Sequence, residues 1–473
     1  MSADSKPAEA PEHTATGRRQ VSEAVLVDPN DGGAVRSKIF QLAGPTLTEM
    51  IMLNMTQMIS MIMVGRLGAN AVATVGLTSQ PYLLMTVCFA ALNMGTTVIV
   101  ARNVGAGRHE EANRAAGQSL LLNAMLSVLL VILTVGFADD LLRLIGAQEE
   151  VVAYGTGYAR ISFAAIGFSA ISSSLSSILR GAGDTRTPMR VNVLTGLASA
   201  LLGFLLIYGH LGLPRLGVAG ASLAVLIAQS GAMTAMLYVM FSGKFAVRLN
   251  RHDLFRFDRA MIGRMLKIGL PTSAEQLVMR LGITLFVMIA ANLGTTAVAA
   301  NQLLTNVIGL SFMPGMAFAG AASTLVGQAL GVGKTELAER YAMQIRRYGM
   351  WVAGIMGALF VLFAPYILML YTGDRAIIDE GTLPLRIVGL IQMSQASMFV
   401  LAGALRGAGE TRYPLVSAVV GVWGVRVLLS LIFVYVFHWG MIGLWTAVAC
   451  DQFARSLLIY RRFRLGRWKT IRI

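Results

Sequence analysis

Residues 180–188 read RGAGDTRTP, and residues 406–414 read RGAGETRYP. The two segments lie 226 residues apart, and shorter segments elsewhere in the chain share this offset. These further matches pair Pro45 with Pro271, Glu49 with Glu275, Leu67-Gly68 with Leu293-Gly294, and Gly105-Ala-Gly107 with Gly331-Val-Gly333. Several separated matches at one spacing indicate that the chain contains two copies of one structural unit.

The composition is apolar and poor in charge. The chain has 473 residues, of which 55% are hydrophobic and only 13% are charged, whereas soluble proteins carry about 25% charged residues. The apolar content excludes a disordered chain, and two cysteines are too few for a disulfide scaffold. The composition therefore predicts a polytopic membrane protein.

Apolar stretches of about 20 residues, the length that crosses a hydrocarbon core, occur twelve times, six in each copy. An even number of spans means that both copies enter the membrane in the same direction. Parallel repeats of this kind are related by an axis along the membrane normal, and a shared cavity is expected between them. The predicted fold is an all-α integral membrane protein of twelve transmembrane helices in two six-helix lobes, residues 36–241 and 266–460.

The segments outside the lobes predict the orientation. Residues 1–35 are polar and predict a disordered tail, residues 242–265 predict a basic linker, and residues 461–473 predict a basic tail. No apolar core follows a basic start in 1–35, so no cleavable signal peptide is expected. Most of the 39 Lys and Arg residues lie on one side if both termini are cytoplasmic. We therefore expect a multi-pass protein of the inner cell membrane with both termini in the cytoplasm.

Four motifs carry a family resemblance: Val64-Gly-Arg-Leu-Gly68, the segment 95–107, the segment 322–334, and the paired RGAG loops. At these motifs the chain resembles the multidrug and toxic compound extrusion (MATE) family over about residues 36–460. The resemblance implies a V-shaped pair of lobes and export of amphipathic drugs or metabolites in exchange for H⁺ or Na⁺. It also implies small amphipathic substrates and membrane lipid as partners, and we expect a monomer.

Glu49 and Glu275 occupy equivalent positions within predicted spans. An ionisable group in hydrocarbon is costly and marks a functional pathway by default. Burial favours the neutral carboxyl form, and a carboxyl that binds and releases protons is what proton exchange requires. The ionised group, aided by nearby oxygens, could instead hold Na⁺, above all at Glu275. The structural alternative is that both side chains brace a neighbouring helix.

The chain departs from the family pattern at other ion-binding positions. Ser60 stands where many members carry an Asp in the first helix, and Gly203 where some carry one in the fifth. Asn192 of that second site is retained. The tenth helix has Gln392 and Gln395 in place of a carboxylate. These departures leave the choice between H⁺ and Na⁺ open.

Polar and charged residues within the spans are the candidates for a substrate cavity. The uncharged candidates are Asn54, Gln57, Asn301, Gln302, Asn306, Gln392 and Gln395. The charged candidates are Arg280, Arg426 and Asp451, although Asp451 and Arg455 have the i,i+4 spacing of an intrahelical pair that Arg426 could join. If Arg280 faces the cavity, it weakens the family's preference for organic cations and admits zwitterions or anions.

The remaining motifs favour structural roles, and other classes of protein lack support. The RGAG loops predict glycine-capped helix ends, held by Arg180–Asp184 and Arg406–Glu410 pairs. The five histidines show no metal-ligand spacing, and no phosphate-binding glycine loop or catalytic cluster is present. We therefore expect no enzyme, no cofactor and no nucleic-acid partner. The alternative function is a lipid-linked glycan flippase of the same broader fold, although such flippases usually carry fourteen spans.

Overall fold

The computed structural model describes residues 31–242, 247–249 and 257–471. The first bundle comprises α2 (Gly32–Gly65), α3 (Ala69–Gly105), α4 (His109–Gly136), α5 (Ala138–Leu144), α6 (Glu149–Ala182), α7 (Arg186–Tyr208), the turn η1 (His210–Gly212) and α8 (Val218–Phe241). The second comprises α10 (Arg259–Ala291), α11 (Thr295–Gly331), α12 (Thr335–Met369), α13 (Arg375–Gly407), α14 (Arg412–Ala418), η2 (Val419–Val427), α15 (Leu428–Leu431), η3 (Ile432–Val436), α16 (Gly440–Arg464) and η4 (Arg467–Thr470). The four segments from α14 to η3 form one continuous span, Arg412–Val436.

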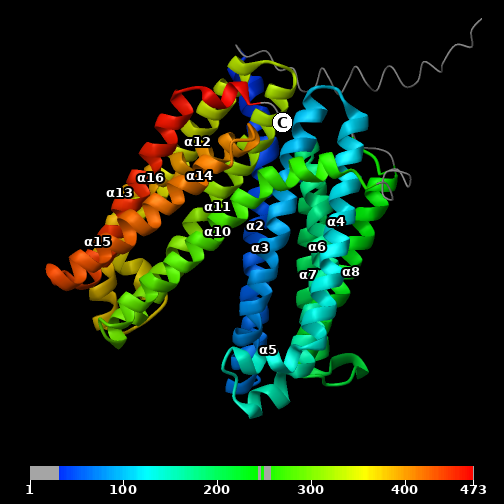
Figure 1. Cartoon of the computed structure of the whole chain (residues 1–473). Helices are drawn as coiled ribbons and strands as arrows, with labels where there is room; N and C mark the ends of the chain where they lie inside the picture. The colour runs from blue at the N-terminus through cyan, green and yellow to red at the C-terminus, as the bar shows by residue number, and fades with distance from the viewer. Residues whose placement is uncertain (1–30, 243–246, 250–256, 472–473) are drawn as a thin grey trace, which may run out of the picture.

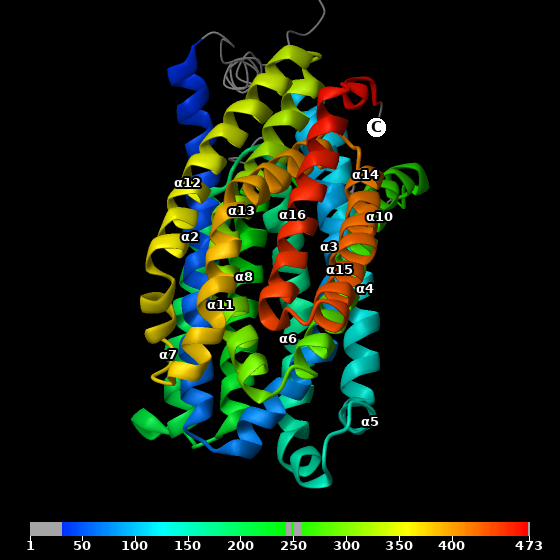
Figure 2. The same cartoon turned by 90° about the vertical axis from the view of Figure 1, so that its left-hand side faces the viewer.

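Eleven helices among the described residues are long and apolar enough to cross a membrane. The twelfth, α16, falls outside that set because it carries Asp451, Arg455 and three arginines in its last turn. It nevertheless packs along α13 and along the Arg412–Val436 span. Figure 2 shows α16 standing beside α13 within the second bundle. The prediction of an all-helical membrane fold in two six-helix lobes is confirmed.

The helix ends differ from the predicted segment boundaries because aspartates cap them. α2 begins at Gly32, inside the predicted 1–35 tail, since Asp31 Oδ1 accepts hydrogen bonds from the amides of Gly33 (2.9 Å) and Ala34 (3.0 Å). α10 begins at Arg259, inside the predicted 242–265 linker, because the Asp258 side chain accepts from the Met261 amide. Residues 1–30 of the predicted tail lie outside the described residues.

The C-terminal segment is folded where a tail was predicted at 461–473. α16 continues to Arg464, and the following turn buries Trp468 completely against Phe463, with ring centroids 4.8 Å apart. Arg102 of the first lobe donates from Nη2 to the Ile471 carbonyl at 2.7 Å. This basic segment is therefore folded up to Ile471 and packs against both lobes.

The two lobes meet at the end of the molecule that holds the C-terminus. Figure 1 shows the bundles converging at that end and diverging at the other, in a V shape. At the convergence, α3 and α11 cross so closely that a Cβ atom on Gly105 would lie 2.1 Å from the Gln328 carbonyl oxygen. A Cβ atom on Gly331 would lie 2.2 Å from the Arg102 carbonyl oxygen. The two contacts are equivalent in the repeat, because Gly331 corresponds to Gly105 and Gln328 to Arg102 at the 226-residue offset. The pseudo-twofold axis therefore passes between α3 and α11.

The start of α2 strengthens this closed end. Val35, Ile39, Leu42 and Ala43 lie in one hydrophobic cluster with side chains of α11, α12, α13 and α16. The first helix of one lobe therefore forms part of the core of the other. Burial of apolar surface between the lobes stabilises the conformation in which this end is shut.

The repeated RGAG loops end helices, as predicted. Gly183 caps α6 with φ 95°, and its counterpart Gly409 follows α13 with φ 89°. This left-handed region is open to glycine and strained for most other residues. Asp184 then accepts from the amides of Arg186 (3.0 Å) and Thr187 (3.1 Å), which starts α7.

Replacing Gly331 by Ala tests the close crossing of α3 and α11. The added methyl would overlap the α3 backbone, and overpacking of this kind costs about 1–3 kcal/mol. We expect Gly331→Ala to lower the thermal midpoint of the purified protein in detergent.

Gly309→Ala is the matched control, because Gly309 lies on the same helix and an added Cβ there meets nothing within 4 Å. Equal midpoints for the two variants would contradict the close crossing.

Candidate ion-coupling and substrate site

Glu49 lies at the junction of three helices of the first lobe. Its Oε1 accepts from Arg180 Nη2 of α6 at 2.6 Å and from Asn192 Nδ2 of α7 at 2.6 Å. The glutamate side chain is 5% exposed and that of Arg180 is 33% exposed. A buried carboxylate is thus held by a guanidinium and an amide, the charge-assisted arrangement that stabilises the ionised group.

Glu275 repeats this arrangement in the second lobe. Its Oε1 accepts from Arg406 Nη2 of α13 at 2.8 Å, and 16% of its side chain is exposed. In both lobes the glutamate and its arginine are 131 residues apart. The counterpart of Asn192 is Ala418, which has no polar side chain, so Glu275 has one partner where Glu49 has two.

The predicted Arg180–Asp184 and Arg406–Glu410 pairs are wrong. Asp184 accepts a hydrogen bond from the Arg186 amide at the start of α7, and Glu410 binds Arg462 at the end of α16. Arg180 and Arg406 were missed as site residues. One feature of the sequence could have identified them: each copy of the repeat has one Glu and one Arg separated by 131 residues.

Each of the two pairs leaves atoms without a partner. Glu49 Oε2 and Glu275 Oε2 are buried and accept no hydrogen bond from the described residues. The Nε atoms of Arg180 and Arg406 are also buried without a partner there. A buried carboxylate oxygen normally has a hydrogen-bond partner, so the free oxygen of each glutamate is an acceptor position that the described residues leave unfilled.

Of the other predicted ion-coupling residues, Asn192 joins this site and Ser60 does not. Ser60 lies eleven residues beyond Glu49 on α2, about 16 Å along a helix axis. It is half-buried, and no contact joins it to Glu49 or Asn192.

The uncharged cavity candidates fall into two groups. Gln57, Gln302 and Asn306 are exposed, and Asn54 is half-buried with its Nδ2 3.9 Å from Met313 Sδ of α11 in the other lobe. Asn301, Gln392 and Gln395 are buried inside the second lobe.

The two glutamines of α13 line a small internal cavity. Gln392 donates from Nε2 to Ser311 Oγ at 3.0 Å, and Gln395 lies on the same wall. The cavity volume is about 10 Å³, roughly enough for one water molecule. These side chains therefore face the space between α11, α12 and α13.

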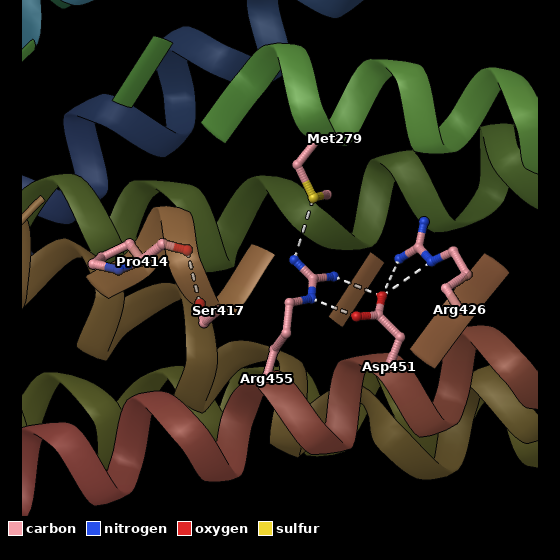
Figure 3. Close-up of polar contacts among 6 residues, drawn as sticks. All are labelled: Met279, Pro414, Ser417, Arg426, Asp451 and Arg455. Atoms are coloured by element: carbon pink, nitrogen blue, oxygen red, sulfur yellow. Dashed lines mark hydrogen bonds and ion pairs between the residues drawn. The ribbon is translucent and has the colours of Figure 1, made fainter. Parts of the chain in front are cut away.

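Arg426, Asp451 and Arg455 form a buried triad in the second lobe (Figure 3). Arg426 Nη2 donates to Asp451 Oδ2 at 2.6 Å, and Arg455 Nε donates to Asp451 Oδ1 at 2.7 Å. Arg455 Nη1 also lies 3.4 Å from Met279 Sδ of α10. The predicted intrahelical pair is confirmed, and Arg426 joins it. Two arginines share one carboxylate, so the triad carries an excess positive charge.

The backbone next to the triad leaves room for it only because residue 421 is a glycine. A Cβ atom on Gly421 would lie 2.3 Å from both Arg455 Cγ and Asp451 Oδ1, so a larger residue there would displace the triad. Arg426 and Gly421 lie in the π-helical segment η2, a backbone form that often marks functional positions. The equivalent positions in the first lobe are Ala200, Val225 and Gln229, so the charged triad belongs to the second lobe alone.

Asp451→Asn tests the role of the triad. The variant leaves two buried guanidinium groups without a counter-charge, which costs about 3–5 kcal/mol. We expect a large fall in the thermal midpoint of the purified protein, whereas Glu149→Gln, at an exposed pair with Arg143, should change it little.

Replacing all three triad residues by apolar ones (Asp451→Leu, Arg426→Met, Arg455→Met) should restore the midpoint, because a packed apolar cluster needs no counter-charge. A midpoint in Asp451→Asn equal to that of the unmodified protein would rule out this account.

Comparisons with known proteins agree with the repeat. The MatE family model matches residues 45–209 and again residues 271–432, one match in each lobe. The chain is 30% identical over 449 residues to a probable multidrug resistance protein NorM of Thermotoga maritima, covering 92% of this chain and 93% of the relative. A probable NorM of Rhizobium meliloti is 26% identical over 417 residues, covering 86% and 88%.

The fold agrees as well. The outward-facing conformation of a multidrug resistance MATE transporter of the MOP superfamily superposes with a TM-score of 0.87 at 25% identity, covering 96% of this chain and 99% of that one. Two matches to the family model, a relative of nearly full length and the superposed fold lead to one assignment. The chain belongs to the MATE family of multi-pass membrane transporters.

Proposed function

We propose that the protein exports small amphipathic molecules in exchange for H⁺ or Na⁺ by alternating access. The observation that carries this proposal is the free Oε2 atom of a buried glutamate in each lobe, next to an arginine at a helix end. A carboxylate with one bound and one free oxygen can exchange its guanidinium partner for a proton or a sodium ion.

The position of Arg180 connects ion binding to lobe movement. Thr324 Oγ1 of α11 donates to the Arg180 carbonyl at 3.2 Å, and Gln328 Nε2 donates to the Gly181 carbonyl at 3.2 Å. The helix end that binds Glu49 therefore also binds the other lobe. A proton or Na⁺ at Glu49 would weaken the pair with Arg180 and so loosen this contact at the closed end.

Glu275 is the first candidate for the coupling residue. It is more exposed than Glu49 and has one polar partner instead of two. An ion can therefore reach Glu275 with less rearrangement than it would need at Glu49.

The proposed location is the inner membrane, with both termini cytoplasmic, and the proposed active form is a monomer. In that orientation the closed end of the V faces the cytoplasm and the diverging end faces outward. The alternative function is a lipid-linked glycan flippase, which the arginines within the spans support slightly. Export of drugs by a sensitised host expressing the protein would separate the two.

The driving ion can be measured in proteoliposomes loaded with a fluorescent amphipathic dye. We expect a pH gradient or a Na⁺ gradient, imposed separately, to drive dye transport, and the ion that drives it is the coupling ion. Equal dye movement with and without gradients would contradict secondary transport.

Glu275→Gln should fold but lose gradient-driven transport, because the amide cannot take up a proton and does not hold Na⁺ as a carboxylate does. The double variant Glu275→Gln with Arg406→Gln separates coupling from bracing. If the pair only braces two helices, neutralising both partners should restore transport; if Glu275 binds the ion, the double variant should stay inactive. Normal gradient dependence in Glu275→Gln would refute the assignment.

A further inference from the structure

One face of α10 follows α3 of the other lobe. A Cβ atom on Gly269 would lie 2.0 Å from the Ala91 carbonyl oxygen, and Ser273 Oγ donates to the Val87 carbonyl at 2.8 Å. Moving four residues forward on α10, from Gly269 to Ser273, therefore moves the contact four residues back on α3, from Ala91 to Val87. The helices are antiparallel and in fixed register along this seam between the lobes.

Arg280 continues the same face. It lies seven residues beyond Ser273, which is close to two helical turns, and the register places it opposite Gln80 of α3. Ser273 is buried, whereas Arg280 and Gln80 are both exposed. The two helices therefore separate between Ser273 and Arg280, and the guanidinium lies where the V begins to open.

The repeat supports the orientation of Arg280 toward the other lobe, but not its place opposite Gln80, because Met313 is equivalent to Val87. The counterpart of Arg280 in the first lobe is Asn54, which approaches Met313 of the second lobe. The equivalent position of each lobe thus faces the other lobe. The difference between the two is chemical: the first lobe offers a neutral amide at this position and the second offers a cation.

The charge of Arg280 has no compensation among the described residues. The helices α2, α3, α10 and α11, which meet along the seams, contain two carboxylates, Glu49 and Glu275. Glu49 is paired with Arg180, and Glu275 is paired with Arg406. Asp451 is shared by two arginines, one of which contacts Met279, the residue before Arg280. The second-lobe side of the opening therefore carries an excess of positive charge.

We propose that Arg280 determines substrate specificity by binding an anionic group, such as a carboxylate, of an amphipathic substrate. A guanidinium binds a carboxylate through two parallel hydrogen bonds, and Gln80 can add a further donor. Exposed Leu84, Leu277 and Leu281 offer apolar surface for the rest of the molecule. This inference rests on the proposed export function and names the class of molecule that the export site accepts.

The test compares two fluorescent dyes of similar size, a carboxylate dye and its cationic ester, in gradient-driven transport by proteoliposomes. We expect the unmodified protein to transport the carboxylate dye. Arg280→Gln should reduce its transport about tenfold or more, as loss of a charge-assisted hydrogen bond predicts, with cationic dye transport unchanged or increased. Arg280→Lys should retain part of the activity, and Arg143→Gln, which removes an arginine from α5, should have no effect on selectivity.

Binding of the same dyes to the purified protein, measured by fluorescence anisotropy, separates this inference from the proposed function. Binding of the carboxylate dye that is lost in Arg280→Gln supports the inference even if no gradient drives transport, in which case the export proposal alone fails. Transport and binding of the cationic dye only, or an equal loss of both dyes in Arg280→Gln, would overturn the role of Arg280.

Discussion

A carboxylate in the first helix of each lobe forms an ion pair with an arginine at the end of the fourth helix, and the proposed coupling depends on this pair. In the first lobe the same helix end is hydrogen-bonded to α11 of the second lobe. Breaking a buried ion pair is costly when one partner is left uncompensated. Under the proposed function, an ion that binds the carboxylate breaks this pair and so changes how the lobes meet.

The crossing of α3 and α11 at the closed end is symmetric, whereas the charges near the opening of the V are not. At the closed end, Gly105 and Gly331 make equivalent backbone contacts across the pseudo-twofold axis. Towards the opening, Asn54 of one lobe corresponds to Arg280 of the other, and the buried triad has no counterpart in the first lobe. In the proposed mechanism the two duplicated lobes rock against each other, and the unequal charges give the substrate a preferred side.

The sequence predicted the parts of the structure that depend on spacing within the chain. The 226-residue offset predicted the two lobes, and the i,i+4 spacing predicted the pair of Asp451 and Arg455. The partners of Arg180 and Arg406 were not predicted, because the acids close to them in sequence have other partners: Asp184 starts a helix and Glu410 binds Arg462. The folded C-terminal turn was also missed, since the burial of Trp468 depends on packing between distant helices.

Distance measurements between spin labels at the diverging ends of the lobes can show whether ion binding moves the lobes. Labels at Leu213 and Tyr371, both exposed, would report on the separation of the lobes in a background without Cys88 and Cys450. If the glutamates couple ion binding to lobe movement, lowering the pH or adding Na⁺ should shift the distance distribution. The variant with both Glu49→Gln and Glu275→Gln should not respond. A distribution that shifts equally in that variant, or that no ion changes, would contradict the account.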